Sequence, residues 1–111
     1  MHVKKTDSAG EDGDFDRKVT LLEEVDSYVP RLLEQKPDVV VVTGDHSTPS
    51  IMGSHSWHPV PTLIHSAFSL ADGTQHFSER GCQLGSLGVM PSSALMSFVL
   101  AHAQRLDKFG A

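Results

Sequence analysis

The segment VVVVTGDHSTP, residues 39–49, decides the fold, because an apolar run ends where metal-type ligands begin. The predicted strand opens at Asp38, and its residues Val39 to Val42 are apolar on both alternating faces, which is typical of a central parallel strand buried under helices. Asp45 and His46 follow it directly, and functional sites in open α/β sheets lie at the carboxyl ends of strands. The segment therefore predicts an α/β fold with a short, mainly parallel sheet and a metal site at its edge.

A second histidine, His55, returns within one loop of this pair. A carboxylate together with imidazoles is a ligand set that suits Zn, Mn, Mg or Fe. The alternative is structural: Asp45 caps a strand-end turn, while His46 and His55 lie in solvent. The Asp45–His46 pair alone leaves both interpretations open; His55, together with the family resemblance given below, favours the metal site.

The region before the strand predicts one long helix. Residues 2–6 are expected to form a short strand, and residues 7–14 an acidic loop punctuated by glycine. Asp14 predicts the N-cap of a helix whose apolar residues recur every three or four positions through Leu33. Pro30 predicts a kink or a restart in that helix, because proline donates no backbone hydrogen bond.

The region after the ligands predicts a strand at residues 60–66 and a final helix. Ser92 or Ser93 is expected to cap that helix and Gly110 to end it, whereas residues 67–90 have no clear pattern. Two or three strands and two helices make a thin layer that gives the apolar strand little cover. We therefore expect residues 1–111 to be a single, incomplete domain, whose exposed strand edges favour a homo-oligomer.

Composition narrows the class of protein. The chain has 111 residues and a formal net charge of -5, so it predicts neither a nucleic-acid partner nor binding to an anionic membrane. No apolar run approaches the ~20 residues of a membrane span, and the first residues lack the apolar core of a signal peptide. Cys82 is the only cysteine, which favours a reducing compartment. We expect a cytoplasmic protein.

Four segments carry a family resemblance in one colinear order: TDSAGEDGDF at 6–15, TGDHSTP at 43–49, HSWHPVP at 55–61 and KFGA at 108–111. Together they resemble the C-terminal part of the archaeal-type cofactor-independent (2,3-bisphosphoglycerate-independent) phosphoglycerate mutases of the alkaline phosphatase superfamily. The resemblance implies a partial alkaline-phosphatase-like layer with flanking helices. It also implies a cytoplasmic isomerase of glycolysis that interconverts 3-phosphoglycerate and 2-phosphoglycerate through a phosphoserine intermediate.

The resemblance also implies two divalent metal ions, drawn from Mn, Zn, Mg or Co. Asp45 and His46 would ligate the ion nearer the serine nucleophile, and Asp7 and His55 the other ion. Glu11 departs from the family, because better-known members have histidine there in the pattern Asp-x-x-Gly-His-Asp-Gly. Glutamate can also ligate a divalent ion, and it favours harder ions such as Mg or Mn. Glu11 is therefore the fifth candidate metal ligand.

The family's serine nucleophile lies far upstream of the matching region, so the resemblance places no catalytic residue in this chain. No substrate-binding residue is assigned, and the chain alone is expected to be inactive. Its expected partners are the missing N-terminal part of the enzyme and phosphoglycerate or a similar small phosphorylated substrate. Because of Glu11, a second activity on the same scaffold also stays open: a phosphomonoesterase, or a phosphonate-metabolising enzyme of the phosphonopyruvate decarboxylase type. The non-catalytic alternative is a metal-binding, oligomeric module.

Overall fold

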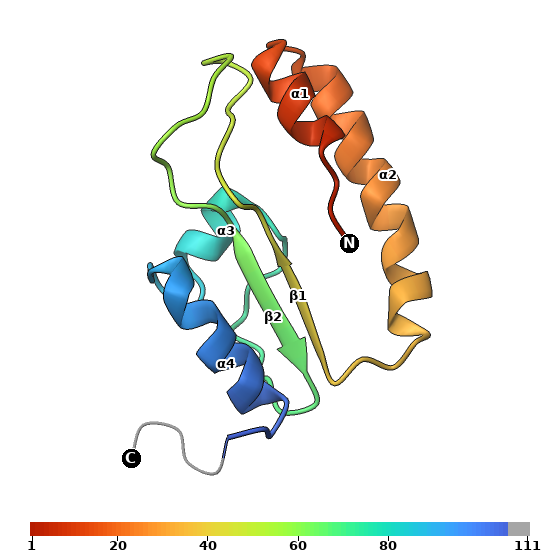
Figure 1. Cartoon of the computed structure of the whole chain (residues 1–111), viewed down its shortest axis with the longest axis vertical. Helices are drawn as coiled ribbons and strands as arrows, with labels where there is room; N and C mark the ends of the chain where they lie inside the picture. Colours follow the sequence, from red (N-terminus) through yellow and green to blue (C-terminus); the bar gives the residue numbers. More distant parts are fainter. Residues whose placement is uncertain (107–111) are drawn as a thin grey trace. The chain divides into compact units, whose positions relative to one another are not determined.

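A computed structural model describes residues 1–106 and divides the chain into two compact units. The first unit takes Met1–Lys36 and Asp45–Pro59, and the second takes Pro37–Gly44 and the chain from Val60 onward. Figure 1 shows the elements of both units in chain order. No helix within the described residues combines the length and apolar character that crossing a membrane requires.

The first unit is built on two packed helices, α1 (Lys5–Glu11) and α2 (Phe15–Leu33). The predicted N-cap of α2 is confirmed: the Asp14 carboxylate accepts a hydrogen bond from the Arg17 backbone N–H at 3.0 Å. The helix continues through Pro30 without a restart and ends three residues later. Proline removes one helical hydrogen bond there, close enough to the end of the helix for the last turn to survive.

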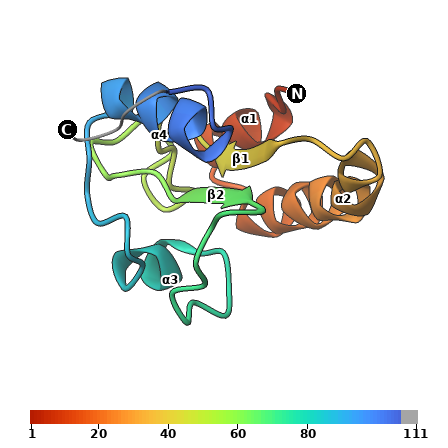
Figure 2. The ribbon, with the colours of Figure 1, turned by 90° about the horizontal axis from the view of Figure 1, so that it is seen from below.

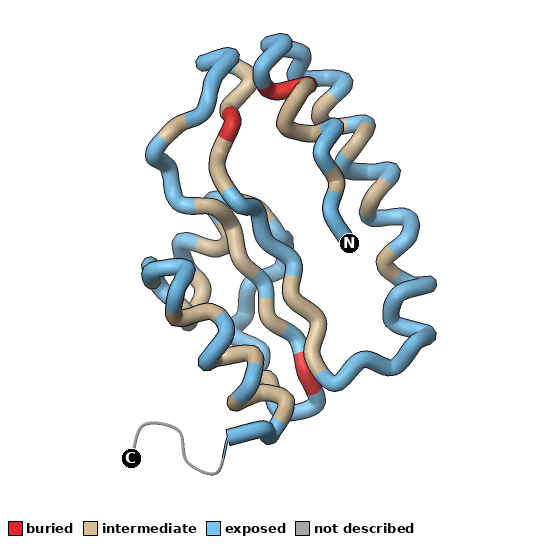
Figure 3. The backbone as a smooth tube through the Cα atoms, in the orientation of Figure 1, coloured by how far each residue is buried: buried red, intermediate tan, exposed pale blue. Residues whose placement is uncertain are grey.

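The expected strand at residues 2–6 and the expected loop at residues 7–14 are wrong: residues 2–4 form no strand, and α1 begins at Lys5 and takes up most of residues 7–14. Gly10 is a poor helix former, which hid this helix in the sequence. The structure buries Ala9 and Gly10 (Figure 3). A Cβ atom at Gly10 would collide with the backbone carbonyl of Thr48. Close packing thus makes glycine necessary here and overrides its low helix propensity.

The second unit holds a two-stranded antiparallel sheet, β1 (Val39–Thr43) and β2 (Thr62–Ser66). In this sheet Val39 lies opposite Ser66 and Thr43 opposite Thr62. The α/β class is confirmed, but the pair is antiparallel where a mainly parallel sheet was expected. A parallel pair needs a long crossover connection, usually helical, and the segment joining β1 to β2 contains no helix.

Strand β1 is less covered than its sequence predicts. Val39 to Val41 are half-buried, and Val42 is 36% exposed. Among the described residues β1 pairs only with β2 and contacts α4 (Leu95–His102). Helices α4 and α3 (Glu79–Gln83) lie on opposite sides of this sheet (Figure 2). The strand's apolar pattern therefore calls for more cover than residues 1–106 supply.

The predicted last helix is present as the 3₁₀ turn η1 (Ser92–Ala94), which leads into α4, but the serine cap is wrong: the N-cap positions of η1 and α4 are Pro91 and Ala94, and no side chain caps either. His102, the last residue of α4, places Nδ1 3.0 Å from Oγ of the buried Ser66 and so ties α4 to β2. The expected helix end at Gly110 and the segment at 108–111 lie outside the described residues.

The segment at residues 67–90, which had no clear pattern, is organised around Asp72. Its carboxylate accepts hydrogen bonds from the backbone N–H groups of Ser86 at 2.9 Å and Thr74 at 3.1 Å. These bonds lower the pKa of Asp72 to about 2. The ionised carboxylate thus holds two distant points of the loop together.

We predict that Asp72→Asn lowers the thermal unfolding midpoint at pH 6 and that this difference fades on acidification. A carboxylate whose pKa falls from 3.8 to about 2 on folding stabilises the fold above pH 3.8 and loses that effect as the pH falls through about 2. Thermal scans between pH 6 and 2 measure it, with Asp26→Asn on the exposed side of α2 as control. A difference that does not vary with pH would contradict this role.

Candidate metal centre

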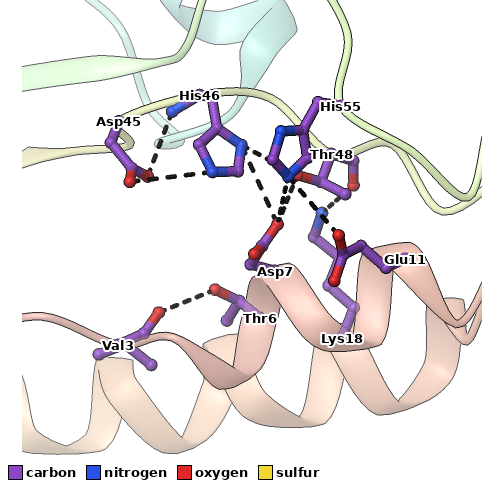
Figure 4. A network of polar contacts seen from close by, with 9 residues as sticks. All are labelled: Val3, Thr6, Asp7, Glu11, Lys18, Asp45, His46, Thr48 and His55. Atoms are coloured by element: carbon purple, nitrogen blue, oxygen red, sulfur yellow. Dashed lines mark hydrogen bonds and ion pairs between the residues drawn. The ribbon is translucent and has the colours of Figure 1, made fainter.

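The first unit gathers acidic and imidazole side chains from three places in the chain (Figure 4). Asp7 and Glu11 stand one turn apart on α1, a spacing that puts both on one helix face. Asp45 and His46 follow β1, and His55 lies further along the same loop. Figure 4 shows Asp7 pointing from α1 toward both imidazole rings.

The distances between these side chains suit a shared ion better than hydrogen bonds. Asp7 Oδ1 lies 3.6 Å from His55 Nε2 and 4.0 Å from His46 Nδ1. Glu11 Oε1 lies 3.7 Å from His55 Nε2. Hydrogen bonds are shorter than this, whereas two ligand atoms each ~2.1 Å from one ion lie roughly 3.0–3.6 Å apart at angles of about 90–120°. The Asp7–His55 pair therefore already has ligand spacing, and the other two pairs are slightly wider.

The donor set therefore fits a divalent cation. One ligand atom from each of Asp7, His46 and His55 lies within 4.8 Å of the other two. Carboxylate oxygen and imidazole nitrogen are also the right chemical types for Zn, Mn or Fe.

His46 faces two carboxylates with its two ring nitrogens. Its Nδ1 is on the side of Asp7, and its Nε2 lies 3.8 Å from Asp45 Oδ2. Asp45 is held in place because its Oδ1 accepts a hydrogen bond from the His46 backbone N–H at 3.2 Å. The ring centroids of His46 and His55 are 3.9 Å apart. His46 thus lies between Asp7 and Asp45, with one ring nitrogen toward each carboxylate.

Thr48 joins the helices to the ligand loop. Its buried hydroxyl donates to Asp7 Oδ1 at 2.7 Å and lies 3.1 Å from His46 Nδ1. Its carbonyl accepts a hydrogen bond from Lys18 Nζ on α2 at 2.6 Å. These bonds hold α1, α2 and the loop together at the site.

The surroundings of Asp7 favour its ionised form. The pKa of Asp7 is lowered mainly by the hydrogen bond that its carboxylate accepts from Thr48. The charges of His46, His55 and Lys4 act in the same direction, against the effect of desolvation. An ionised carboxylate is the form that binds metal, so Asp7 is ready to bind a cation across the physiological pH range.

The model of the Metalloenzyme superfamily matches residues 1–102 of this chain. The chain belongs to the Metalloenzyme superfamily. The matched range includes all five candidate ligands and both helices that carry or support them. A cluster of metal-type donors is thus found in a chain of a metal-enzyme family.

Curated relatives of this Metalloenzyme superfamily member carry the name probable 2,3-bisphosphoglycerate-independent phosphoglycerate mutase. The protein of Thermotoga neapolitana is 55% identical, and that of Aquifex aeolicus 52% identical, each over all 111 residues. The protein of Deinococcus radiodurans is 51% identical over the same length. The chain spans 27–28% of the length of these relatives and corresponds to their C-terminal part. The resemblance noted in the sequence is confirmed.

A solved structure of the PH0037 protein from Pyrococcus horikoshii is similar to this superfamily member. It has a TM-score of 0.87 and 35% sequence identity, and the match covers 96% of this chain and 33% of that protein. The fold described here is therefore also found as about a third of a longer protein.

The five candidate ligands named from the sequence all lie in the first unit, where they form one connected group. Their role as metal ligands remains a prediction. The sequence reasoning missed the supporting residues Gly10, Lys18 and Thr48. Thr48 stands two residues after His46, but its contact with Asp7 spans 41 residues, and no local pattern reveals such a contact.

We predict that Gly10→Ala destabilises the protein and weakens its binding of Mn²⁺. The added methyl group would push Thr48 away from α1, and overpacking of this kind costs about 1–3 kcal/mol. Urea unfolding and calorimetric titration with Mn²⁺ measure the two effects. Ser8→Ala, on the same helix, is the matched control; equal behaviour of the two variants would show that the close approach has no role.

Proposed function

We propose that this chain is the C-terminal, metal-binding part of a cofactor-independent phosphoglycerate mutase. The parent enzyme would interconvert 3-phosphoglycerate and 2-phosphoglycerate through a phosphoserine intermediate, in the cytoplasm and as a step of glycolysis. The observation that carries the proposal is the convergence of Asp7, His46 and His55. Relatives matched over the whole chain bear the name of this mutase.

The site in this chain is one part of the proposed machinery. The chain spans 27% of its Aquifex aeolicus relative, and the serine nucleophile and further ligands are proposed to come from the rest of the parent protein. The partly exposed β1 supports this view, because its apolar pattern exceeds the cover that the described residues give. Residues 1–111 would then be part of one larger domain.

The donor atoms suggest how the chain would hold two ions. Asp7, His55 and Glu11 would hold one, and Asp45 and His46 the other. When bound, such ions neutralise charge on the transferring phosphoryl group and lower the pKa of the nucleophile. Within the chain, the hydrogen bond from Thr48 favours the ionised form of Asp7, and the loop brings both imidazoles near that carboxylate. The distance of 3.7 Å between Glu11 Oε1 and His55 Nε2 supports Glu11 as a ligand that favours Mn or Mg.

Glu11 also favours a second candidate, a phosphomonoesterase or phosphonate-metabolising enzyme on the same scaffold. A glutamate beside His55 adds negative charge where the mutase pattern has a histidine. That charge would alter how a phosphorylated substrate sits near the ion. Assays with 3-phosphoglycerate and with an aryl phosphate ester distinguish the two activities.

We predict that the full-length parent protein converts 3-phosphoglycerate to 2-phosphoglycerate and loses this activity when a chelator removes its metal. His55→Ala should lower kcat/KM at least about 100-fold, because it removes a ligand at the site of charge stabilisation. An enolase-coupled assay measures the rate. His76→Ala, at an exposed histidine of the second unit, should be unchanged.

Two results would contradict this proposal. A protein that hydrolyses the aryl ester readily and does not isomerise phosphoglycerate would be a phosphatase. Full mutase activity after complete removal of metal, or in the His55→Ala variant, would show that the cluster does not serve the reaction.

We predict further that Glu11→His changes the metal preference of the site. Replacing a carboxylate with an imidazole removes one negative charge and adds a softer ligand, so Zn²⁺ should gain affinity relative to Mn²⁺ by about tenfold or more. Competitive calorimetric titrations on the parent protein measure the ratio. Glu11→Gln, which removes the charge without adding an imidazole, is the control; an unchanged Zn²⁺/Mn²⁺ ratio in Glu11→His would place residue 11 outside the ligand set.

A further inference from the structure

We propose that Thr48 is a positioning residue that fixes His46 as the Nδ1–H tautomer and so directs its Nε2 toward Asp45. The metal-binding consequence rests on the proposed function, whereas the tautomer itself does not. Thr48 is 4% exposed and contacts both Asp7 and His46, which are assigned to different candidate ions. Thr48 would thereby decide which of the two candidate ions His46 can ligate.

The Thr48 hydroxyl has a single proton to donate. Its Oγ1 lies 2.7 Å from Asp7 Oδ1. An ionised carboxylate only accepts hydrogen bonds, so the hydroxyl proton must point to Asp7. The hydroxyl then has only lone pairs left for its other neighbour, His46 Nδ1, at 3.1 Å. That contact is a hydrogen bond only if Nδ1 carries a proton.

The proton on Nδ1 determines the state of the other ring nitrogen. A neutral imidazole has one N–H, so a protonated Nδ1 leaves Nε2 with a free lone pair. Metal ligation requires such an unprotonated nitrogen. Nε2 faces Asp45 Oδ2 at 3.8 Å. His46 would therefore join Asp45 at one ion and leave the other ion to Asp7 and His55, although Nδ1 is only 4.0 Å from Asp7.

Thr48 itself has little freedom to turn away. Its carbonyl accepts the hydrogen bond from Lys18 Nζ at 2.6 Å, and the backbone of Gly10 packs against it. The arrangement matters because histidine in water favours the opposite tautomer, Nε2–H. Orientation of a ligating histidine by a hydrogen bond to its other nitrogen is a general feature of metal sites, and losing it weakens metal binding about 10–100-fold.

The test uses the parent protein labelled with ¹⁵N-histidine, metal-free, at a pH where the imidazoles are neutral. Two-bond ¹H–¹⁵N correlations show which nitrogen of His46 carries the proton. We expect Nδ1–H in the native protein and in Thr48→Ser, which keeps the hydroxyl. Thr48→Val, which keeps the shape and loses the hydroxyl, should move toward Nε2–H.

Calorimetric titration with Mn²⁺ gives the second readout. Thr48→Val should bind about 10–100-fold more weakly than the native protein, and Thr48→Ser should stay close to native affinity. The native spectrum decides the tautomer even if a variant fails to fold. An Nε2–H signal for His46 in the native protein, or an unchanged tautomer in folded Thr48→Val, would overturn the inference even in an active mutase. A native protein with Nδ1–H but no metal binding would instead count against the proposed function.

Discussion

The candidate site depends on the close approach of α1 to the ligand loop at Gly10 and Thr48. Only a residue without a side chain lets the loop carbonyl come so near the helix. That approach brings the Thr48 hydroxyl onto Asp7, and the carbonyl onto Lys18 of α2. The acidic residues of α1 and the histidines of the loop then meet across a gap of 3.6–4.0 Å. Without this contact the ligands would belong to two separate segments.

The ligand cluster combines partly buried side chains with exposed ones. Asp7 and His46 are partly buried, with side chains 24% and 33% exposed, whereas Glu11 and His55 remain more than half exposed. The carboxylate oxygens and the unprotonated imidazole nitrogens present more lone pairs than the nearby hydroxyl and N–H protons can satisfy. A divalent cation would stabilise such a group more than water does. This favours a ligand site over a structural network of hydrogen bonds.

Much of the site could be predicted from the sequence, since the ligand types, their order and the apolar strand before them are local features. The N-cap at Asp14 and the helix to Leu33 followed from capping chemistry and helical period. The direction of β2 and the helical state of α1 did not follow. A mainly parallel sheet was expected because β1 is apolar on both faces, but its partner returns after a helix-free loop. Helix α1 contains Gly10, which is required there by its close contact with Thr48, 38 positions later in the sequence.

The most direct test of this account is an anomalous diffraction measurement on crystals of the parent protein grown with Mn²⁺. The account predicts a manganese peak within about 2.2 Å of a carboxylate oxygen of Asp7 and of His55 Nε2. It also predicts that Thr48 keeps its bond to Asp7. A well-ordered Asp7 and His55 with no peak between them, in crystals containing excess Mn²⁺, would contradict the central claim that these residues form a metal site.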